Sequence, residues 1–166
     1  LLTKSAASEH SPAWLDNDRI AFLTAKDGVQ QIFSMDANGR HRKQLSFSDK
    51  DIEGFLFSPD FKHVLTVMSV PNPLVKEQQY EDLPKASGMI ADDLMFRHWD
   101  SWVTSLPHPF ISEFDGNKVG DKAIDLLENE PYESPMLPFG GMEEFDWSPD
   151  GKSIAYTCRK KAGLEY

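Results

Sequence analysis

Two adjacent carboxylates, Glu143 and Glu144, are the side chains of this sequence best suited to binding a ligand. They follow a proline-rich segment, residues 128–141, and precede a short stretch that ends at Trp147. Paired carboxylates can accept the hydrogen bonds of an ammonium group. In a strand, however, successive side chains point to opposite faces, which would separate the two acids. The pair is therefore a candidate binding site, and a solvent-exposed strand start is the alternative.

Arg97 is a second candidate, in a segment whose apolar residues recur at helical spacing. This spacing predicts a short helix over residues 90–102. On such a helix Arg97 could bind a peptide carbonyl or carboxylate group. The alternative is that Arg97 pairs with Asp100 or faces solvent. Four apolar side chains of the helix are expected to pack against a sheet: Leu94, Met95, Trp99 and Trp102.

Other kinds of site are not indicated by the composition. The 5 histidines show no ligand spacing, and the single cysteine, Cys158, excludes a multi-cysteine zinc site, so we expect no metal and no cofactor. We interpret Cys158 as a small apolar residue at a strand end. The formal net charge of −10, from 27 acidic and 17 basic residues, argues against nucleic acid or an anionic membrane as a partner. No apolar run approaches the roughly 20 residues that span a bilayer.

A repeated phrase organises the rest of the chain. WSPDGKSIAY at residues 147–156 is matched by FSPDFKHV at 57–64 and, more loosely, by WLDNDRI at 14–20. In each, an aromatic residue precedes a tight turn, and an alternating strand follows it. Asp60 and Asp150 are expected to bond the backbone of their own turns. Three copies indicate a repeat architecture.

The repeat divides the 166 residues into units of four antiparallel strands. An apolar first strand and a polar last strand are typical of a β-propeller blade. We predict an all-β fold, a partial β-propeller of four-stranded antiparallel blades with one short helix-containing insertion. The first full unit has strands at 11–15, 19–24, 31–35 and 42–46. The second has strands at 52–57, 64–70, 109–114 and 123–127, and the third has strands at 142–147 and 153–157. The predicted divisions are the last strand of a preceding blade (1–10), a blade (11–48), a blade (52–127) with an insertion (71–109), and the start of a blade (142–166).

Two long connections distinguish the second unit from the first. They are the insertion at 71–109 and the proline-rich segment at 128–141. In an up-and-down blade both connections leave on the same face, and the opposite face keeps short turns. We therefore expect one decorated face, which carries Glu143, Glu144 and Arg97, because loops on a rigid scaffold usually hold the functional residues.

The turn phrase at 147–156 resembles the blade motif of TolB-like propellers and of the propeller in the prolyl oligopeptidase family of serine peptidases. The insertion phrases DLPKAS at 82–87 and DDLMFRHWDSW at 92–102 resemble the bacterial dipeptidyl peptidase V and acylaminoacyl-peptidase branch of that family. The resemblance implies an N-terminal propeller followed by a C-terminal α/β-hydrolase domain with a Ser-Asp-His triad. It also implies that a Glu pair, here Glu143 and Glu144, grips the free amino end of a substrate, although in those enzymes the pair lies on an inserted helix.

No catalytic residue is expected within this chain. The nucleophile elbow Gly-x-Ser-x-Gly needs a serine with one glycine two residues before it and another two residues after it, and no serine of this chain has both. The leading hypothesis is the non-catalytic propeller portion of a serine peptidase, which gates and recognises short peptides for the hydrolase domain of the same chain. A TolB-like protein-binding module without enzymatic activity is the alternative, and an enzyme with its site in the propeller channel is a third. About two and a half blades leave open edges that would allow homo-oligomers. The resemblance implies a bacterial protein, periplasmic or cytoplasmic.

Overall fold

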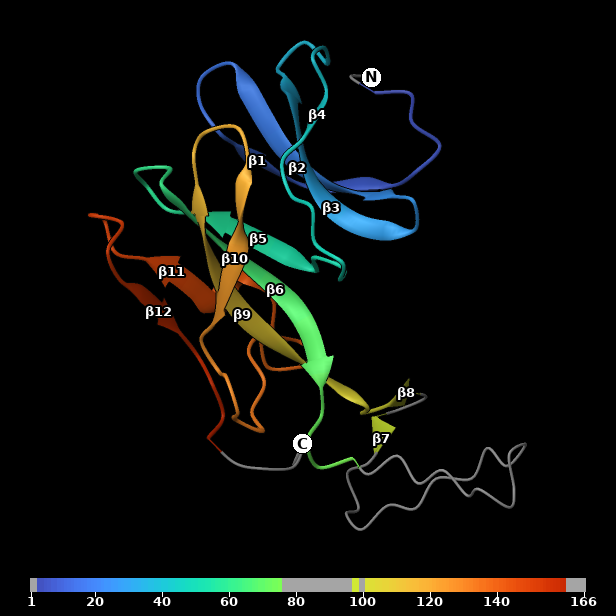
Figure 1. Cartoon of the computed structure of the whole chain (residues 1–166), viewed down its shortest axis with the longest axis vertical. Helices are drawn as coiled ribbons and strands as arrows, with labels where there is room; N and C mark the ends of the chain where they lie inside the picture. Colours follow the sequence, from blue (N-terminus) through green and yellow to red (C-terminus); the bar gives the residue numbers. More distant parts are fainter. Residues whose placement is uncertain (1–2, 76–96, 99–100, 161–166) are drawn as a thin grey trace.

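Antiparallel strands account for nearly all regular structure in the part of the chain that the structure describes. The computed structural model describes residues 3–75, 97, 98 and 101–160, and within them the predicted all-β class is confirmed (Figure 1). Two four-stranded antiparallel sheets, each with strands in sequence or reverse-sequence order, are followed by a two-stranded one. The helical structure in the described residues is a single 3-10 turn, Met142–Glu144.

Sheet 1 matches the predicted first unit in strand number and order. Its third connection is a tight turn in which the Gly39 N–H donates to the Asp36 carbonyl at 2.8 Å. Gly28 has a φ of +87° in the preceding hairpin turn, a conformation that glycine adopts without steric cost. The sheet has the order β1 (Glu9–Trp14), β2 (Arg19–Lys26), β3 (Val29–Asp36) and β4 (Lys43–Gln44).

Sheet 2 has the same antiparallel order, and its last strand begins earlier than the predicted residue 123. This strand, β10, lies at the sheet edge with residues 121–124 exposed, so it lacks the apolar alternation that marks a buried strand. The interior strand β6 is buried along most of its length, and its bounds agree with the prediction within a few residues. The strands are β5 (Gly54–Phe57), β6 (His63–Pro71), β9 (Ser105–Phe114) and β10 (Val119–Asp125).

The strand register confirms the repeat. A third hairpin is formed by β11 (Phe145–Trp147) and β12 (Ile154–Tyr156). In all three units the aromatic residue that ends the first strand lies opposite a β-branched aliphatic residue on the second. These pairs are Trp14 with Ile20, Phe57 with Val64, and Trp147 with Ile154.

The two copies of the turn that are most alike in sequence, at 57–62 and 147–152, are stabilised by equivalent hydrogen bonds. The Asp60 carboxylate accepts from the Ser58 hydroxyl at 2.8 Å and from the Lys62 N–H at 3.1 Å. Asp150 accepts from the hydroxyl two residues before it at 2.7 Å and from the N–H two residues after it at 3.1 Å. The serine hydroxyl, followed by the backbone N–H, holds the pKa of each carboxyl below its ordinary value. The predicted structural role of both acids is confirmed.

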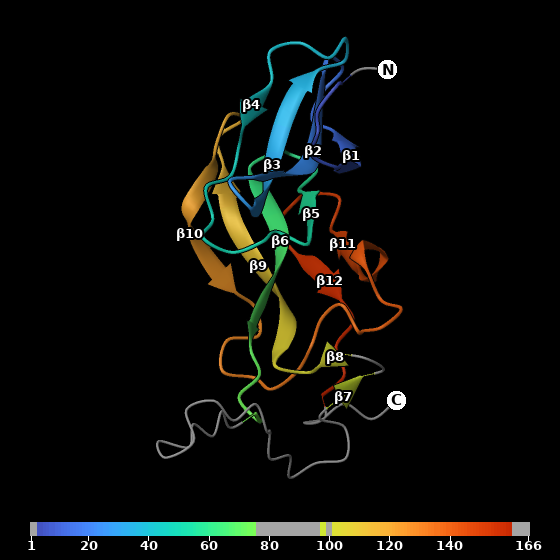
Figure 2. The same ribbon diagram turned by 90° about the vertical axis from the view of Figure 1, so that its right-hand side faces the viewer.

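Both faces of sheet 2 are covered by its neighbours in the chain. Alternate residues of β6 point to opposite sides. Val64 and Met68 pack into a core shared with sheet 1, whereas Leu65 and Val67 pack against the β11–β12 hairpin. Figure 2 shows the ribbons of sheet 1, sheet 2 and this hairpin. The first core contains, among others, Leu23, Ile32, Leu45, Ile52, Phe110 and Phe114. Sheet 2 is therefore the middle of three stacked layers.

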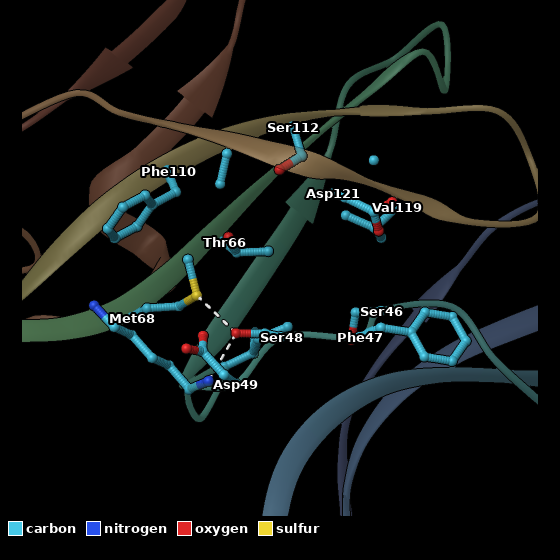
Figure 3. A pocket seen from close by; sticks show the side chains of 14 residues that line it. Ser46, Phe47, Ser48, Asp49, Thr66, Met68, Phe110, Ser112, Val119 and Asp121 are labelled. Carbon is cyan, nitrogen blue, oxygen red and sulfur yellow. Dashed lines mark hydrogen bonds between the residues drawn. The ribbon is translucent and has the colours of Figure 1, made fainter.

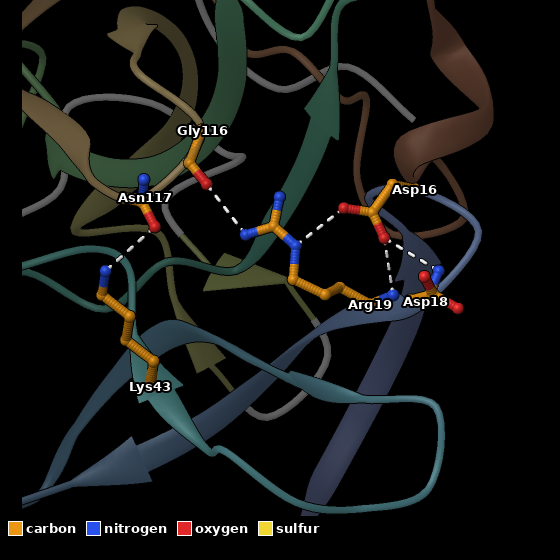
Figure 4. Close-up of polar contacts among 6 residues, drawn as sticks. All are labelled: Asp16, Asp18, Arg19, Lys43, Gly116 and Asn117. Atoms are coloured by element: carbon orange, nitrogen blue, oxygen red, sulfur yellow. Dashed lines mark hydrogen bonds and ion pairs between the residues drawn. The ribbon is translucent and has the colours of Figure 1, made fainter.

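Sheet 2 and the segment 46–52, which links the two sheets, line a cavity of about 350 Å³ (Figure 3). Polar contacts join sheet 2 to sheet 1 directly. Arg19 Nη1 donates to the Gly116 carbonyl at 3.0 Å, in the turn between β9 and β10 (Figure 4). Asp16 orients this guanidinium by accepting from its Nε at 2.7 Å. Lys43 Nζ donates to Asn117 Oδ1 at 3.2 Å. These contacts join the short turn of sheet 2 to sheet 1.

The predicted helix over residues 90–102 is wrong where the chain is described. Arg97–His98 (β7) and Ser101–Trp102 (β8) form a short antiparallel ladder, in which Arg97 lies opposite Trp102. Trp102 is 47% exposed, so much of its ring faces solvent. Strand pairing has overridden the helical spacing here. The expected packing of Leu94, Met95 and Trp99 concerns residues outside the described part of the chain.

Candidate functional site

Both long connections leave sheet 2 at the same end, as the strand order predicts. The insertion departs where β6 ends and returns where β9 begins, and Asn72 bridges its two ends. The Asn72 N–H donates to the Thr104 carbonyl at 2.9 Å, and its side-chain amide donates to Val103 at 3.0 Å. The proline-rich segment docks at this end too, because the Ser134 N–H donates to the Pro107 carbonyl at 3.0 Å.

Ser134 anchors the proline-rich segment between sheet 2 and β12. Its side chain is fully buried, and its hydroxyl donates to the Thr157 carbonyl at 2.8 Å. The peptide bond before Pro135 is cis, as is the one before Pro138. The segment then reaches Gly140 and the 3-10 turn that holds the acidic pair. The turn thus lies at the end of sheet 2 from which the long connections emerge.

Glu144 is tied into the surrounding structure. Its Oε2 accepts from the Met136 N–H at 3.0 Å and from the Thr157 hydroxyl at 2.6 Å. A Cβ at Gly140 would clash with Glu144 Oε1 and with the Met136 carbonyl oxygen, so glycine is required there. These contacts connect the proline-rich segment to the end of β12. Glu144 therefore already has hydrogen-bond donors of its own.

Glu143 has different surroundings from its neighbour. Its side chain is exposed, and among the described residues its carboxylate has no hydrogen-bond donor. A Cβ at Gly141 would lie 2.7 Å from Glu143 Oε2, so a larger residue there would displace the Glu143 side chain, which is free to move because it is exposed. The pair was expected to open a strand, and that prediction is wrong because both acids lie in the 3-10 turn. The Glu143 carboxylate can accept hydrogen bonds from a cation. Glu144 can stabilise the 3-10 turn from which Glu143 projects.

Arg97 lies on the backbone of β7, within the insertion that emerges at this end. Its side chain is outside the described part of the chain. The structure therefore brings Glu143 and Glu144 together, and leaves the contribution of Arg97 as a prediction.

A buried ionisable pair near the same end was missed by the sequence analysis. The His108 side chain is 4% exposed, and its Nδ1 lies 3.0 Å from Asp125 Oδ2. Asp125 Oδ1 also accepts from the Leu127 N–H at 2.8 Å. Among the described residues, His108 Nε2 has no hydrogen-bond partner. One sequence pattern could have indicated this burial. His108 alternates along β9 with the buried Leu106 and Phe110, so its side chain points to the same face as theirs.

Other chemistry is not supported by the described residues. Cys158 is partly buried, and this burial raises the pKa of its thiol, which disfavours the nucleophilic thiolate. The described residues contain no group of three or more His, Cys, Asp or Glu side chains arranged to hold a metal ion. They also contain no helix long and apolar enough to cross a membrane.

Comparison with known proteins finds relatives along nearly the whole chain, although no family model matches. Dipeptidyl-peptidase 5 of Porphyromonas gingivalis is 47% identical over 167 residues, covering 99% of this chain and 24% of the relative. Dipeptidyl-peptidase 5 of Porphyromonas endodontalis is 37% identical over 166 residues, with the same coverage of 99% and 24%. Dipeptidyl-peptidase 5 of Aspergillus fumigatus is 33% identical over 167 residues, covering 88% of this chain and 23% of the relative.

The chain thus spans 23–24% of the length of these relatives. Its resemblance to the dipeptidyl peptidase branch, inferred from the blade and insertion phrases, is confirmed. This chain is a segment homologous, over nearly its whole length, to about a quarter of a dipeptidyl-peptidase 5 protein.

Proposed function

We propose that this chain is the non-catalytic, partial β-propeller portion of a serine peptidase of the dipeptidyl type. In this proposal residues 11–48 and 52–127 are blades, residues 142–166 start a third, and residues 1–10 end a preceding one. The propeller gates access and recognises short peptides for a C-terminal α/β-hydrolase domain of the same protein. Open blade edges allow self-association of the isolated chain.

One observation carries the propeller assignment: the first strands of three successive units converge. A single surface hollow is lined by residues that include Trp14 of β1, Phe57 of β5 and Trp147 of β11. Trp147 Nε1 also donates to the Leu56 carbonyl at 3.2 Å, which connects two of these strands directly. Innermost strands that meet around a common axis are the geometry of a propeller channel. The three stacked layers support the same arrangement.

The relatives' names support a peptidase as the parent protein. Since the chain covers about a quarter of their length and lacks a nucleophile elbow, the hydrolytic residues would lie elsewhere in the protein. A TolB-like protein-binding module remains the second candidate, favoured by the turn phrase, which that family shares. The peptidase proposal predicts that the full-length protein hydrolyses peptides, whereas the binding-module proposal predicts that it does not.

The test is an assay of the full-length protein on dipeptidyl chromogenic substrates, with the isolated chain in parallel. We expect hydrolysis by the full-length protein, complete loss of activity after treatment with a serine-directed fluorophosphonate, and no hydrolysis by the isolated chain. Absence of hydrolysis by a folded full-length protein would favour the binding module. Fluorophosphonate-sensitive hydrolysis by the isolated chain would overturn the assignment of a non-catalytic portion.

Within this function, Glu143 is proposed to bind the free amino group of the peptide, with Glu144 supporting the turn and Arg97 binding a peptide carbonyl or carboxylate. Glu143→Gln in the full-length protein should raise KM for dipeptidyl substrates by about tenfold or more, because a charge-assisted hydrogen bond is lost. The effect on kcat should be small if this contact is equally strong in the transition state.

Glu128→Gln is the matched control, since Glu128 is an exposed glutamate of the neighbouring proline-rich segment. Its KM should equal that of the unchanged protein. An unchanged KM for Glu143→Gln, in an enzyme that remains fluorophosphonate-sensitive, would remove the proposed role of Glu143 and leave the peptidase assignment intact.

A further inference from the structure

The cavity between sheet 2 and the segment 46–52 has the size of a small-molecule site. Its volume is about 350 Å³, within the range of roughly 300–1,000 Å³ typical of ligand pockets. One wall is the face of β6 and β9 that carries Thr66 and Ser112, and the other is the segment 46–52 between β4 and β5 (Figure 3). It opens on the face of sheet 2 that packs against sheet 1, whereas β11 and β12 cover the other face. The cavity is thus separate from the turn that holds Glu143.

Two residues that line this cavity, Thr66 and Ser112, carry hydroxyl groups that face no protein partner among the described residues. Thr66 is 3% exposed and Ser112 is 4% exposed. Among the described residues neither hydroxyl forms a hydrogen bond. Ser46 lines the same cavity and behaves differently, because its Oγ donates to Gln31 Oε1 at 2.8 Å and accepts from the Ile32 N–H at 2.8 Å. Both oxygens keep some contact with solvent, so a molecule in the cavity can reach them and form the hydrogen bonds that the described residues do not supply.

The remaining walls of the cavity are mainly apolar. Phe110, Ile52 and Val119 contribute ring and aliphatic carbon. Met68 adds a thioether whose sulfur accepts from the Ser48 hydroxyl at 3.5 Å. An apolar wall with two free hydroxyls suits a ligand that has a hydrocarbon body and a single polar group.

The charges at the mouth of the cavity balance. Asp49 and Lys50 are adjacent residues of opposite sign that both line it. Asp121, also at the lining, forms an ion pair with Lys118 at 2.7 Å. Because these four charges sum to zero, the site offers no net attraction to an ion of either sign. The preferred ligand is therefore uncharged.

We propose that this cavity binds a small uncharged organic molecule, with an apolar ring and one hydroxyl or amide group, that hydrogen-bonds to Thr66 and Ser112. At roughly 30 Å³ per water, the volume corresponds to about a dozen water molecules, which is enough for a substituted benzene ring. The ring lies against Phe110 and Met68, and its polar group faces the two hydroxyls. This inference does not depend on the peptidase assignment.

Phenol and toluene are the probes, because both contain a benzene ring of the same size and only phenol carries a hydroxyl group that can hydrogen-bond. Binding to the full-length protein is measured by calorimetry and ligand-observed NMR. Phenol should bind more tightly than toluene. Ser112→Ala and Thr66→Val should each weaken phenol binding by about three- to tenfold and leave toluene binding unchanged. Neither should lower the stability of the ligand-free protein, because neither hydroxyl has a protein partner to lose.

Ser105→Ala is the matched control, since Ser105 is an exposed serine of the same strand, β9. It should leave the binding of both probes unchanged. The proposal is overturned if phenol does not bind, if toluene binds as tightly as phenol, or if Ser105→Ala weakens phenol binding as much as Ser112→Ala. It is also overturned if Ser112→Ala and Thr66→Val destabilise the ligand-free protein without changing phenol affinity, because the hydroxyls would then serve the fold.

Discussion

Replacing Trp147 by alanine should lower the free energy of unfolding by about 3–5 kcal/mol, the usual cost of truncating a large buried aromatic residue. Trp147 is 9% exposed and packs with Leu65 and Val67 of sheet 2. Its Nε1 donates to the Leu56 carbonyl at 3.2 Å, and its ring stacks on His63 with 6.2 Å between centroids. Since β11 and β12 are short, this side chain supplies much of what holds their hairpin to sheet 2.

Trp14 is the control that the repeat itself provides. It occupies the same position of the turn phrase, opposite Ile20, but is 62% exposed. Trp14→Ala should therefore cost less than about 1 kcal/mol. Urea unfolding is followed by far-UV circular dichroism, because each variant removes a fluorophore. Equal losses for Trp14→Ala and Trp147→Ala would show that burial on sheet 2 is not what makes Trp147 important.

Replacing Asp125 by alanine should cost about 2–4 kcal/mol, because it removes one partner of a buried pair. His108 would keep a 4% exposed side chain and lose its Nδ1 contact, which is 3.0 Å from Asp125 Oδ2. The Leu127 N–H would lose its acceptor as well. His108 Nε2 already has no partner among the described residues, so the ring has nothing there to offset the loss.

Asp121 provides the comparison for Asp125. It lies on the same strand, β10, and its side chain is 77% exposed, where it pairs with Lys118. Asp121→Ala should cost less than about 1 kcal/mol, as is usual for an exposed ion pair. Both variants are compared by urea unfolding at one pH. If Asp125→Ala is no more costly than Asp121→Ala, the buried pair does not contribute to the fold as the geometry suggests.

The repeat units could be predicted because their turns are held by local contacts. Asp60 and Asp150 bond groups only two residues away, so the same short phrase produces the same turn wherever it occurs. The residue that pairs with the aromatic one then lies six or seven residues after it. This is why the predicted equivalence of Trp14, Phe57 and Trp147 agrees with the observed register.

Segments without such local contacts were predicted less well. The apolar spacing at 90–102 indicated a helix, but residues 97, 98, 101 and 102 pair as strands. The polar β10 was placed too late because an exposed edge strand carries no apolar alternation. In both cases the conformation depends on which backbone lies alongside, and local spacing does not encode that.

The sequence by itself determined the all-β class, the turn chemistry and the family resemblance, because each depends on residues close together in the chain. The spacing of the repeated phrase added the four-stranded unit, although β6 pairs with β9 across the long insertion. Only the tertiary structure decided how the acidic pair is used. Glu144 bonds to Met136 and Thr157, which approach it from two directions, while Glu143 remains exposed. The burial of the His108–Asp125 pair was likewise decided only by the packed structure. The physical reason is that burial and hydrogen-bond partners depend on which distant segments pack together.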